Sequence, residues 1–164
     1  MSGPRGTAKD RALRLLGVRW RSRQELKRRL AAAGFEQLEI DAALQALEDV
    51  GLIDDARFAR ELVRDRAVHR MSGDRAIQAA LREKGVAPEL ASRALEGAGD
   101  EGERARALAS SKAARMTSLD PQAAYRRLFG LLMRRGFGPS LAREAAEEAL
   151  RGIFPAGSVP EEGA

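Results

Sequence analysis

Two stretches of the sequence concentrate basic side chains that could bind anions. The first leads into a predicted helix and contains Arg19, Arg21, Arg23, Lys27, Arg28 and Arg29. The second lies in a later predicted helix and contains Arg126, Arg127, Arg134 and Arg135. A guanidinium group can form paired hydrogen bonds with a phosphate or a carboxylate. These basic residues are therefore the candidate partner contacts, and a solvated helix face is the alternative interpretation.

The overall charge agrees with an anionic partner. The 164 residues include 29 Lys and Arg against 24 Asp and Glu, which gives a net charge of +5. A basic balance favours nucleic acid or an acidic protein surface as the partner, but the interleaved acids make this signal moderate.

Other reactive groups are scarce. The chain has no cysteine and one histidine, His69, so we expect no disulfide and no Cys or His metal cluster. His69 falls near a predicted helix end, where an imidazole commonly faces solvent or the last carbonyls. The sequence contains no Gly-rich phosphate loop and no nucleophile with a histidine and an acid. We therefore predict that the chain is not an enzyme and needs no cofactor or metal.

Two further motifs have competing interpretations. Asp54 and Asp55 form an acid pair that could serve in metal binding or acid–base chemistry, but helix capping is the favoured role. Trp20 could stack on a base or an arginine, but a lone tryptophan before a helix more often covers a core.

The elements that must position these residues repeat three times at a spacing of 51 residues. The aligned positions are Leu26, Ile77 and Leu128; Leu30, Leu81 and Leu132; Gly34, Gly85 and Gly136; and Phe35, Val86 and Phe137. Such periodicity indicates a repeat protein whose functional surface spans several repeats.

Each repeat contains the signals of three helices. Ser22 and Glu25 have capping-box spacing, the aligned glycines suit helix ends, and Asp120–Pro121 suits a helix start. The glycine-containing segment 96–102 is predicted to be a hinge or linker, followed by a helix over about 103–115. We predict an all-α fold of three tandem three-helix repeats, nine helices in all. The predicted boundaries are 1–51 (with a flexible N-terminus), 52–97 and 98–152, followed by a disordered tail over 153–164.

No stretch of the sequence has the length and apolarity of a membrane span or a signal-peptide core. We therefore expect a soluble, cytoplasmic protein.

Three motifs together resemble the RecX family of recombination regulators. Residues 51–59 contain an Asp-Asp-x-x-Phe-Ala motif, and a basic segment follows over 64–75 and leads to a Lys-Gly-apolar turn at 84–86. Residues 22–30 are similar to the family's first-repeat motif. The likeness extends over about residues 8–152. It departs at residues 70–73, where many members carry an aromatic residue and a lysine.

The resemblance implies an elongated, curved array of three repeats that binds the RecA recombinase. It implies that the protein lies in the groove of the RecA–DNA filament and inhibits ATP hydrolysis and strand exchange, thereby modulating homologous recombination and DNA repair. We expect a monomer, with non-specific DNA contact as a possible addition. Basic patches near both ends would suit a two-ended grip on a filament.

A DNA-binding protein built from helix-turn-helix-like repeats is the alternative. Acidic residues in the third helices weigh against it, because they would repel phosphates in a major groove. These residues are Glu39, Asp41, Glu48, Asp49, Glu144, Glu147 and Glu148. A pure scaffold or adaptor also stays open.

Overall fold

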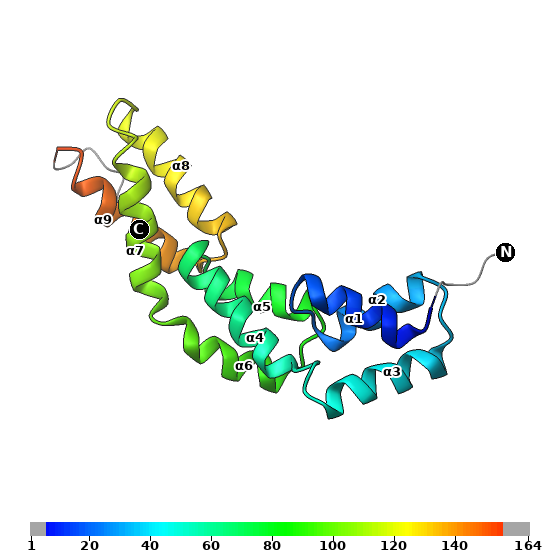
Figure 1. Cartoon of the computed structure of the whole chain (residues 1–164). Helices are drawn as coiled ribbons and strands as arrows, with labels where there is room; N and C mark the ends of the chain where they lie inside the picture. The colour runs from blue at the N-terminus through cyan, green and yellow to red at the C-terminus, as the bar shows by residue number, and fades with distance from the viewer. Residues whose placement is uncertain (1–5, 156–164) are drawn as a thin grey trace. The chain divides into compact units, whose positions relative to one another are not determined.

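The structure is a computed structural model that describes residues 6–155. Over this range the chain forms nine α-helices and no strand (Figure 1). The helices are α1 (Ala8–Val18), α2 (Arg23–Ala32), α3 (Gln37–Asp49), α4 (Asp55–Arg64), α5 (Asp74–Glu83), α6 (Pro88–Leu95), α7 (Glu101–Ala113), α8 (Pro121–Arg134) and α9 (Pro139–Arg151). A π-helical turn (Asp65–His69) extends α4, and a 3₁₀ turn (Glu96–Ala98) extends α6. The predicted all-α class and the nine helices are confirmed.

The described chain divides into two compact units. The first unit contains the residues up to Leu62 together with Ala80–Ala94, and the second contains Val63–Ala79 together with the residues from Leu95 onward. The division falls inside α4 and α5 and before the last residue of α6, so each of these helices belongs partly to both units. The repeat boundaries at 51, 97 and 152 stay a prediction.

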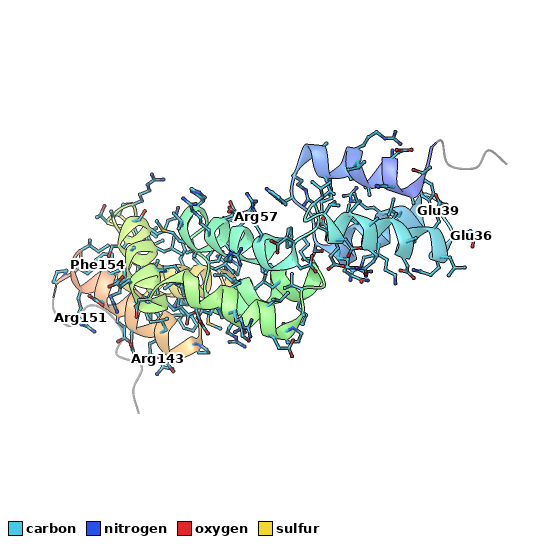
Figure 2. The ribbon with its side chains drawn as sticks, turned by 60° about the horizontal axis from the view of Figure 1, so that its bottom comes forward. Glu36, Glu39, Arg57, Arg143, Arg151 and Phe154 are labelled. Carbon is cyan, nitrogen blue, oxygen red and sulfur yellow. The ribbon has the colours of Figure 1, made fainter. Side chains whose placement is uncertain are left out.

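In the first unit, α1, α2 and α3 pack against one another. Their core contains Leu26, Leu30 and Leu44, whose side chains are fully buried. The carboxylate of Glu39 accepts a hydrogen bond of 2.8 Å from the Ala8 amide, so a side chain of α3 pairs with the first backbone amide of α1 (Figure 2). Burial of a continuous apolar stripe is the main stabilising term of such a helix group.

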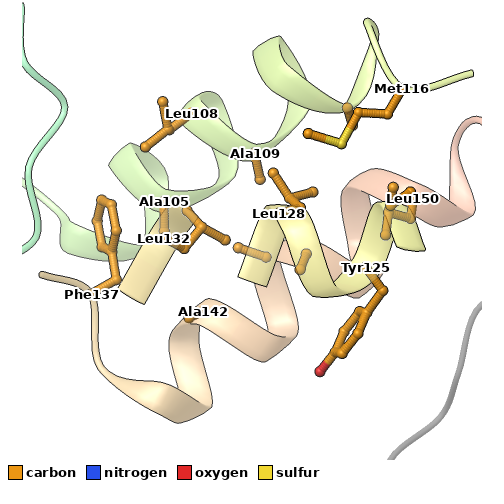
Figure 3. Close-up of a cluster of buried hydrophobic side chains, with 14 residues drawn as sticks. Ala105, Leu108, Ala109, Met116, Tyr125, Leu128, Leu132, Phe137, Ala142 and Leu150 are labelled. Atoms are coloured by element: carbon orange, nitrogen blue, oxygen red, sulfur yellow. The ribbon is translucent and has the colours of Figure 1, made fainter. Parts of the chain in front are cut away.

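In the second unit, α7, α8 and α9 enclose a second core (Figure 3). Leu128, Leu132 and Phe137 are fully buried in it. Ile153 and Phe154, at the start of the predicted tail, pack against the same core. The rest of that tail, 156–164, lies outside the described residues, as does the N-terminal stretch 1–5 of the predicted flexible N-terminus.

The residues that recur at the repeat spacing have the same structural role in each repeat. All six aligned aliphatic residues are completely buried: Leu26, Ile77, Leu128, Leu30, Leu81 and Leu132. Gly34, Gly85 and Gly136 have φ angles of +89°, +71° and +89°, in the left-handed region that glycine adopts most readily. The 51-residue period therefore repeats one apolar helix face and the turn that ends it.

Two predicted helix starts need correction. Ser22 accepts a hydrogen bond of 3.1 Å from the Glu25 amide, but the Glu25 carboxylate binds cations instead of closing the capping box. The helix predicted over 103–115 begins two residues earlier, at Glu101, because Asp100 accepts the Glu103 amide at 2.7 Å. The segment predicted to be a hinge thus contains a 3₁₀ turn, a helix cap and the first residues of α7.

Candidate partner-binding surfaces

The acid pair at the start of α4 serves two different helices. Asp54 accepts the Arg57 amide at 2.9 Å and so caps α4 itself, as predicted. Asp55 accepts the amide of Arg23, the first residue of α2, at 2.8 Å. Burial raises the pKa of the Asp55 carboxyl above its usual value, and the hydrogen bond from Arg23 opposes this only in part. The pair joins neighbouring helices, a structural role that accounts for both carboxylates.

Three cations of the first unit surround the buried carboxylate of Glu25. Arg19 binds it through both terminal nitrogens, and Arg21 and Lys84 approach one of its oxygens at 3.5 and 3.6 Å. Burial opposes ionisation of Glu25, but the hydrogen bond from Arg19 and the nearby positive charges outweigh it and lower the pKa of Glu25. Arg21 is itself buried and donates from Nε to the Leu15 carbonyl at 3.2 Å. Its position suits a structural role better than contact with a partner.

Most other residues of the first basic patch also have intramolecular partners. Arg23 pairs with Glu48 at 3.2 Å, and Lys27 pairs with Asp41 at 3.5 Å. The side chain of Arg28 donates to the Glu83 carbonyl at 2.9 Å. Only Arg29 of this patch is exposed without an ion pair or side-chain hydrogen bond to a described residue. Five of the six cations of this patch therefore have an intramolecular partner, and three carboxylates offset at most half of their charge.

The second basic patch keeps more of its charge available. Arg126, Arg127 and Arg134 are exposed on α8, and their side chains form no ion pair or hydrogen bond within the described part of the chain. The guanidinium of Arg135 donates to the Arg70 carbonyl. Uncompensated guanidinium groups on one helix suit an anionic partner.

A hollow of about 450 Å³ in the second unit adds residues that the sequence prediction missed. Arg66, His69 and Arg70 line it, together with Arg134 and Arg135 from the end of α8. Ser72 and Ala76 complete its lining. The basic character of the segment 64–75 was visible in the sequence, but its proximity to the second basic patch was not.

Two uncommon backbone features shape this hollow. The Arg70 amide donates to the Asp65 carbonyl at 3.2 Å, five residues back, which defines the π-helical turn. Met71 follows with a φ angle of +46°, a conformation that non-glycine residues rarely adopt. The Gly73 amide then donates to the Arg135 carbonyl at 2.8 Å and joins this turn to the end of α8. Such strained segments often occur at functional sites.

Models of three protein families match this chain in succession. They describe the first three-helix domain of RecX over residues 8–47, the second over 54–95 and the third over 100–146. The chain belongs to the RecX family. Among its relatives, a "Regulatory protein RecX" from Corynebacterium efficiens is 42% identical over 147 residues, covering 85% of this chain and 70% of the relative. Another, from Mycobacterium avium, is 43% identical over 140 residues, covering 84% and 81%.

Solved structures agree with this assignment at the level of the fold. The crystal structure of RecX from Lactobacillus salivarius has a TM-score of 0.74 and 24% identity, covering 87% of this chain and 94% of that one. A second RecX crystal structure has a TM-score of 0.73 and 22% identity, covering 85% and 71%. The named relatives of this RecX chain are regulatory proteins, and their names denote no enzyme.

Two further kinds of site, a membrane-spanning helix and a metal-binding cluster, are absent from the described residues. None of them is long and apolar enough to cross a membrane. Within residues 6–155, no group of three or more His, Asp or Glu side chains is arranged to hold a metal ion.

Proposed function

We propose that this RecX chain binds the RecA recombinase in its filament with DNA and inhibits ATP hydrolysis and strand exchange. The observation that carries the proposal is the succession of three RecX domain matches along residues 8–146. Acting as a monomer in the cytoplasm, the protein would thereby modulate homologous recombination and DNA repair.

The basic residues are the proposed contacts, in an order set by how much of their charge is available. Arg126, Arg127 and Arg134 come first, because their exposed side chains have no partner within the described residues. Arg29 follows for the same reason. Arg19, Arg23, Lys27, Arg28 and Arg135 would have to exchange an internal contact for an external one. Contacts on more than one repeat strengthen each other, since the first raises the effective concentration of the second.

The test is DNA-stimulated ATP hydrolysis by the cognate RecA, titrated with this protein from substoichiometric to equimolar ratios. Inhibition well below one molecule per recombinase monomer supports a regulator of the filament. The double substitution Arg126→Glu with Arg127→Glu is expected to relieve the inhibition. A control that reverses the exposed Arg115 and Arg143 makes the same charge change elsewhere in the second unit. Unchanged hydrolysis at every ratio would contradict the proposal.

Direct DNA binding is the second candidate, and the uncompensated arginines of α8 are the observation that favours it. Acidic residues of α3 and α9 weigh against insertion of those helices into a groove. Measurement without recombinase separates the two candidates. DNA affinity that falls steeply with salt, together with unaltered ATP hydrolysis, would favour the second.

A further inference from the structure

The hollow in the second unit has an internal counterpart in the first. Adding the 51-residue repeat spacing converts Arg19 to Arg70, Arg21 to Ser72 and Lys84 to Arg135. The first three residues surround the carboxylate of Glu25, whereas the second three line the hollow. The same spacing converts Glu25 to Ala76, which also lines the hollow. The second unit therefore has the surrounding groups of an anion site without the carboxylate.

Hydrogen bonds to the backbone carbonyls of two aligned residues support this correspondence. In the first unit, the Ser22 hydroxyl donates to the Lys84 carbonyl at 2.5 Å. In the second, the Gly73 amide, one repeat spacing later, donates to the carbonyl of Arg135 at 2.8 Å. We call each of these places a junction. In the first junction the turn after α5 meets the start of α2, and in the second the turn after α8 meets the start of α5.

A carboxylate also accepts the first amide of that second helix in both junctions. Asp55 accepts the Arg23 amide, and Glu101 accepts the Asp74 amide, each at 2.8 Å. The two junctions thus satisfy the same backbone positions, a turn carbonyl and the first amide of a second helix. They differ at the central position, where Glu25 supplies a negative charge in the first junction and Ala76 supplies none in the second.

The hollow has an excess of positive charge. Arg66 and Arg134 form no ion pair or side-chain hydrogen bond with any residue of the described range. The Nε of Arg70 pairs with Asp65 at 3.0 Å, which leaves its terminal nitrogens available. Arg135 has the Arg70 carbonyl as its partner. Among the described residues, four guanidinium groups and no carboxylate line the hollow, and like charges at such proximity favour an added anion.

We propose that this hollow binds a phosphate group in the position that Glu25 occupies in the first junction. Arginine forks match the oxygens of a phosphate, and the His69 imidazole and the Ser72 hydroxyl add donors. Solvent reaches the site, because His69, Arg70 and Arg134 are exposed. The volume of about 450 Å³ lies in the usual range of small-ligand sites, roughly 300–1,000 Å³.

The inference deepens the proposed function and rests on it only for the source of the phosphate. We assign that source to the backbone of DNA in the filament. A small phosphate compound, such as pyrophosphate or a nucleotide, offers the same chemistry. The test therefore includes both kinds of probe, and neither measurement needs a recombinase.

The first experiment uses His69, which is the only histidine and gives unambiguous imidazole resonances. The full chain is titrated separately with pyrophosphate and with a single-stranded oligonucleotide while these resonances are followed by NMR. A saturable shift with the oligonucleotide supports the site and assigns the phosphate to DNA. A shift with pyrophosphate alone supports the site and assigns it to a small compound. No shift with either probe overturns the proposal.

The second experiment removes charge from the hollow. Arg66→Gln with Arg134→Gln is expected to weaken oligonucleotide binding about tenfold or more and to reduce the salt slope of log K for the single strand by about 1.4. The matched control is Arg115→Gln with Arg143→Gln, at exposed positions of the same unit; Figure 2 shows Arg143 projecting from α9. The control is expected to stay within about twofold. An equal loss in both pairs overturns the site.

The third experiment supplies the missing carboxylate. Ala76→Glu is expected to abolish the pyrophosphate response of His69, because a carboxylate of the chain then occupies the hollow. Ala76→Gln fills the same volume without the charge and is expected to weaken the response less. A full response of His69 to pyrophosphate in folded Ala76→Glu overturns the proposal. If that variant does not fold, the oligonucleotide affinities of the Arg66/Arg134 and Arg115/Arg143 double variants serve as the test. Inhibition of RecA is measured on the same proteins. Loss of the phosphate response without loss of inhibition, or the reverse, then shows which of the two proposals is wrong.

Discussion

At the scale of single residues, Glu25 organises the first junction. Its carboxylate attracts Arg19, Arg21 and Lys84, and Arg21 is as buried as Glu25 itself, at 7% and 8% exposure. A buried ion pair need not exceed a well-packed apolar pair in stability, but loss of one partner leaves a buried charge without compensation. Glu25 is therefore a sensitive position.

Glu25→Gln is expected to lower the free energy of unfolding by about 3 kcal/mol near pH 7, because Arg21 then lacks its counter-charge. Urea denaturation measures the difference, and Glu36→Gln at an exposed position is the control. The pKa of Glu25 is lower in the folded chain, so its stabilising effect is present above the ordinary value of 4.5 and is lost as pH falls through the folded value. The difference between wild type and variant should shrink at acidic pH. A difference that persists there would contradict this explanation.

Trp20 contacts a cation on the adjacent α4. The guanidinium of Arg57 lies 4.2 Å from the ring centroid, and the indole remains 39% exposed. The structure thus shows the arginine stacking that the sequence left as the less favoured alternative to core cover.

Arg57→Ala is expected to reduce stability by about 0.5–1 kcal/mol, the magnitude of an exposed cation–π contact. Because Trp20 is the only tryptophan, its emission reports the change directly. Arg60→Ala, on the same helix, is the control and should leave the emission unchanged. A spectrum of Arg57→Ala identical to that of wild type would argue against the contact in solution.

At the scale of elements, the left-handed turns do more than end helices. Gly34 and Gly136 share a φ angle of +89°, but their surroundings differ. A Cβ atom at Gly34 would meet nothing within 4 Å, whereas one at Gly136 would lie 2.4 Å from the Cβ of Ala76. The turn at Gly136 thus approaches α5 at a distance that only glycine permits.

This difference separates backbone strain from steric overlap. Gly34→Ala is expected to cost about 1–2 kcal/mol for the left-handed conformation alone. Gly136→Ala is expected to cost about 1–3 kcal/mol more, because the turn must move away from α5. Thermal and urea denaturation of the two variants measure both values. Equal losses would mean that the second junction tolerates a side chain at this turn.

The sequence predicted the elements better than their contacts. Helix ends follow from local signals: Asp54 and Asp120 cap the helices they precede, and Gly34 and Gly136 end the helices before them. The resemblance added the family, which the domain matches bear out. Local signals did not predict that Glu25 would bind cations in place of its own helix start.

The hollow could not be predicted from local patterns. Arg70 and Arg135 are 65 residues apart, and only the packed junction brings them together. The π-helical turn and the left-handed Met71 also lack a sequence signal of their own: Ser72 and Gly73 mark a turn, but they specify neither feature. The repeat alignment relates Arg19 to Arg70 and Lys84 to Arg135, but its chemical meaning depends on knowing that Glu25 lies between the first pair.

At the scale of the whole molecule, the chain passes between the compact units three times, each time within a helix. The unit boundary falls between residues 62 and 63 in α4, between 79 and 80 in α5, and between 94 and 95 at the end of α6. Unfolding either unit would remove packing partners from a helix that continues into the other. We therefore expect the units to unfold together, as coupled neighbours in a repeat array do.

Gly136→Ala tests this coupling, because it perturbs the second unit whereas Trp20 lies in the first. Tryptophan emission and far-UV circular dichroism should give coincident urea transitions, both shifted to lower urea. An emission midpoint equal to that of wild type, with a shifted dichroism curve, would mean that the units unfold independently.

The separation along the chain between the two sides of each junction bears on how the protein folds during synthesis. Ser22 and the carbonyl of Lys84 are 62 residues apart, so the start of α2 lacks this partner until the second repeat has left the ribosome. At about 5–20 residues per second, roughly 3–12 s pass between translation of the two residues. Nascent α2 must rely meanwhile on contacts with α1 and α3. A ribosome pause within that interval would prolong exposure of the unpaired hydroxyl donor of Ser22 to chaperones.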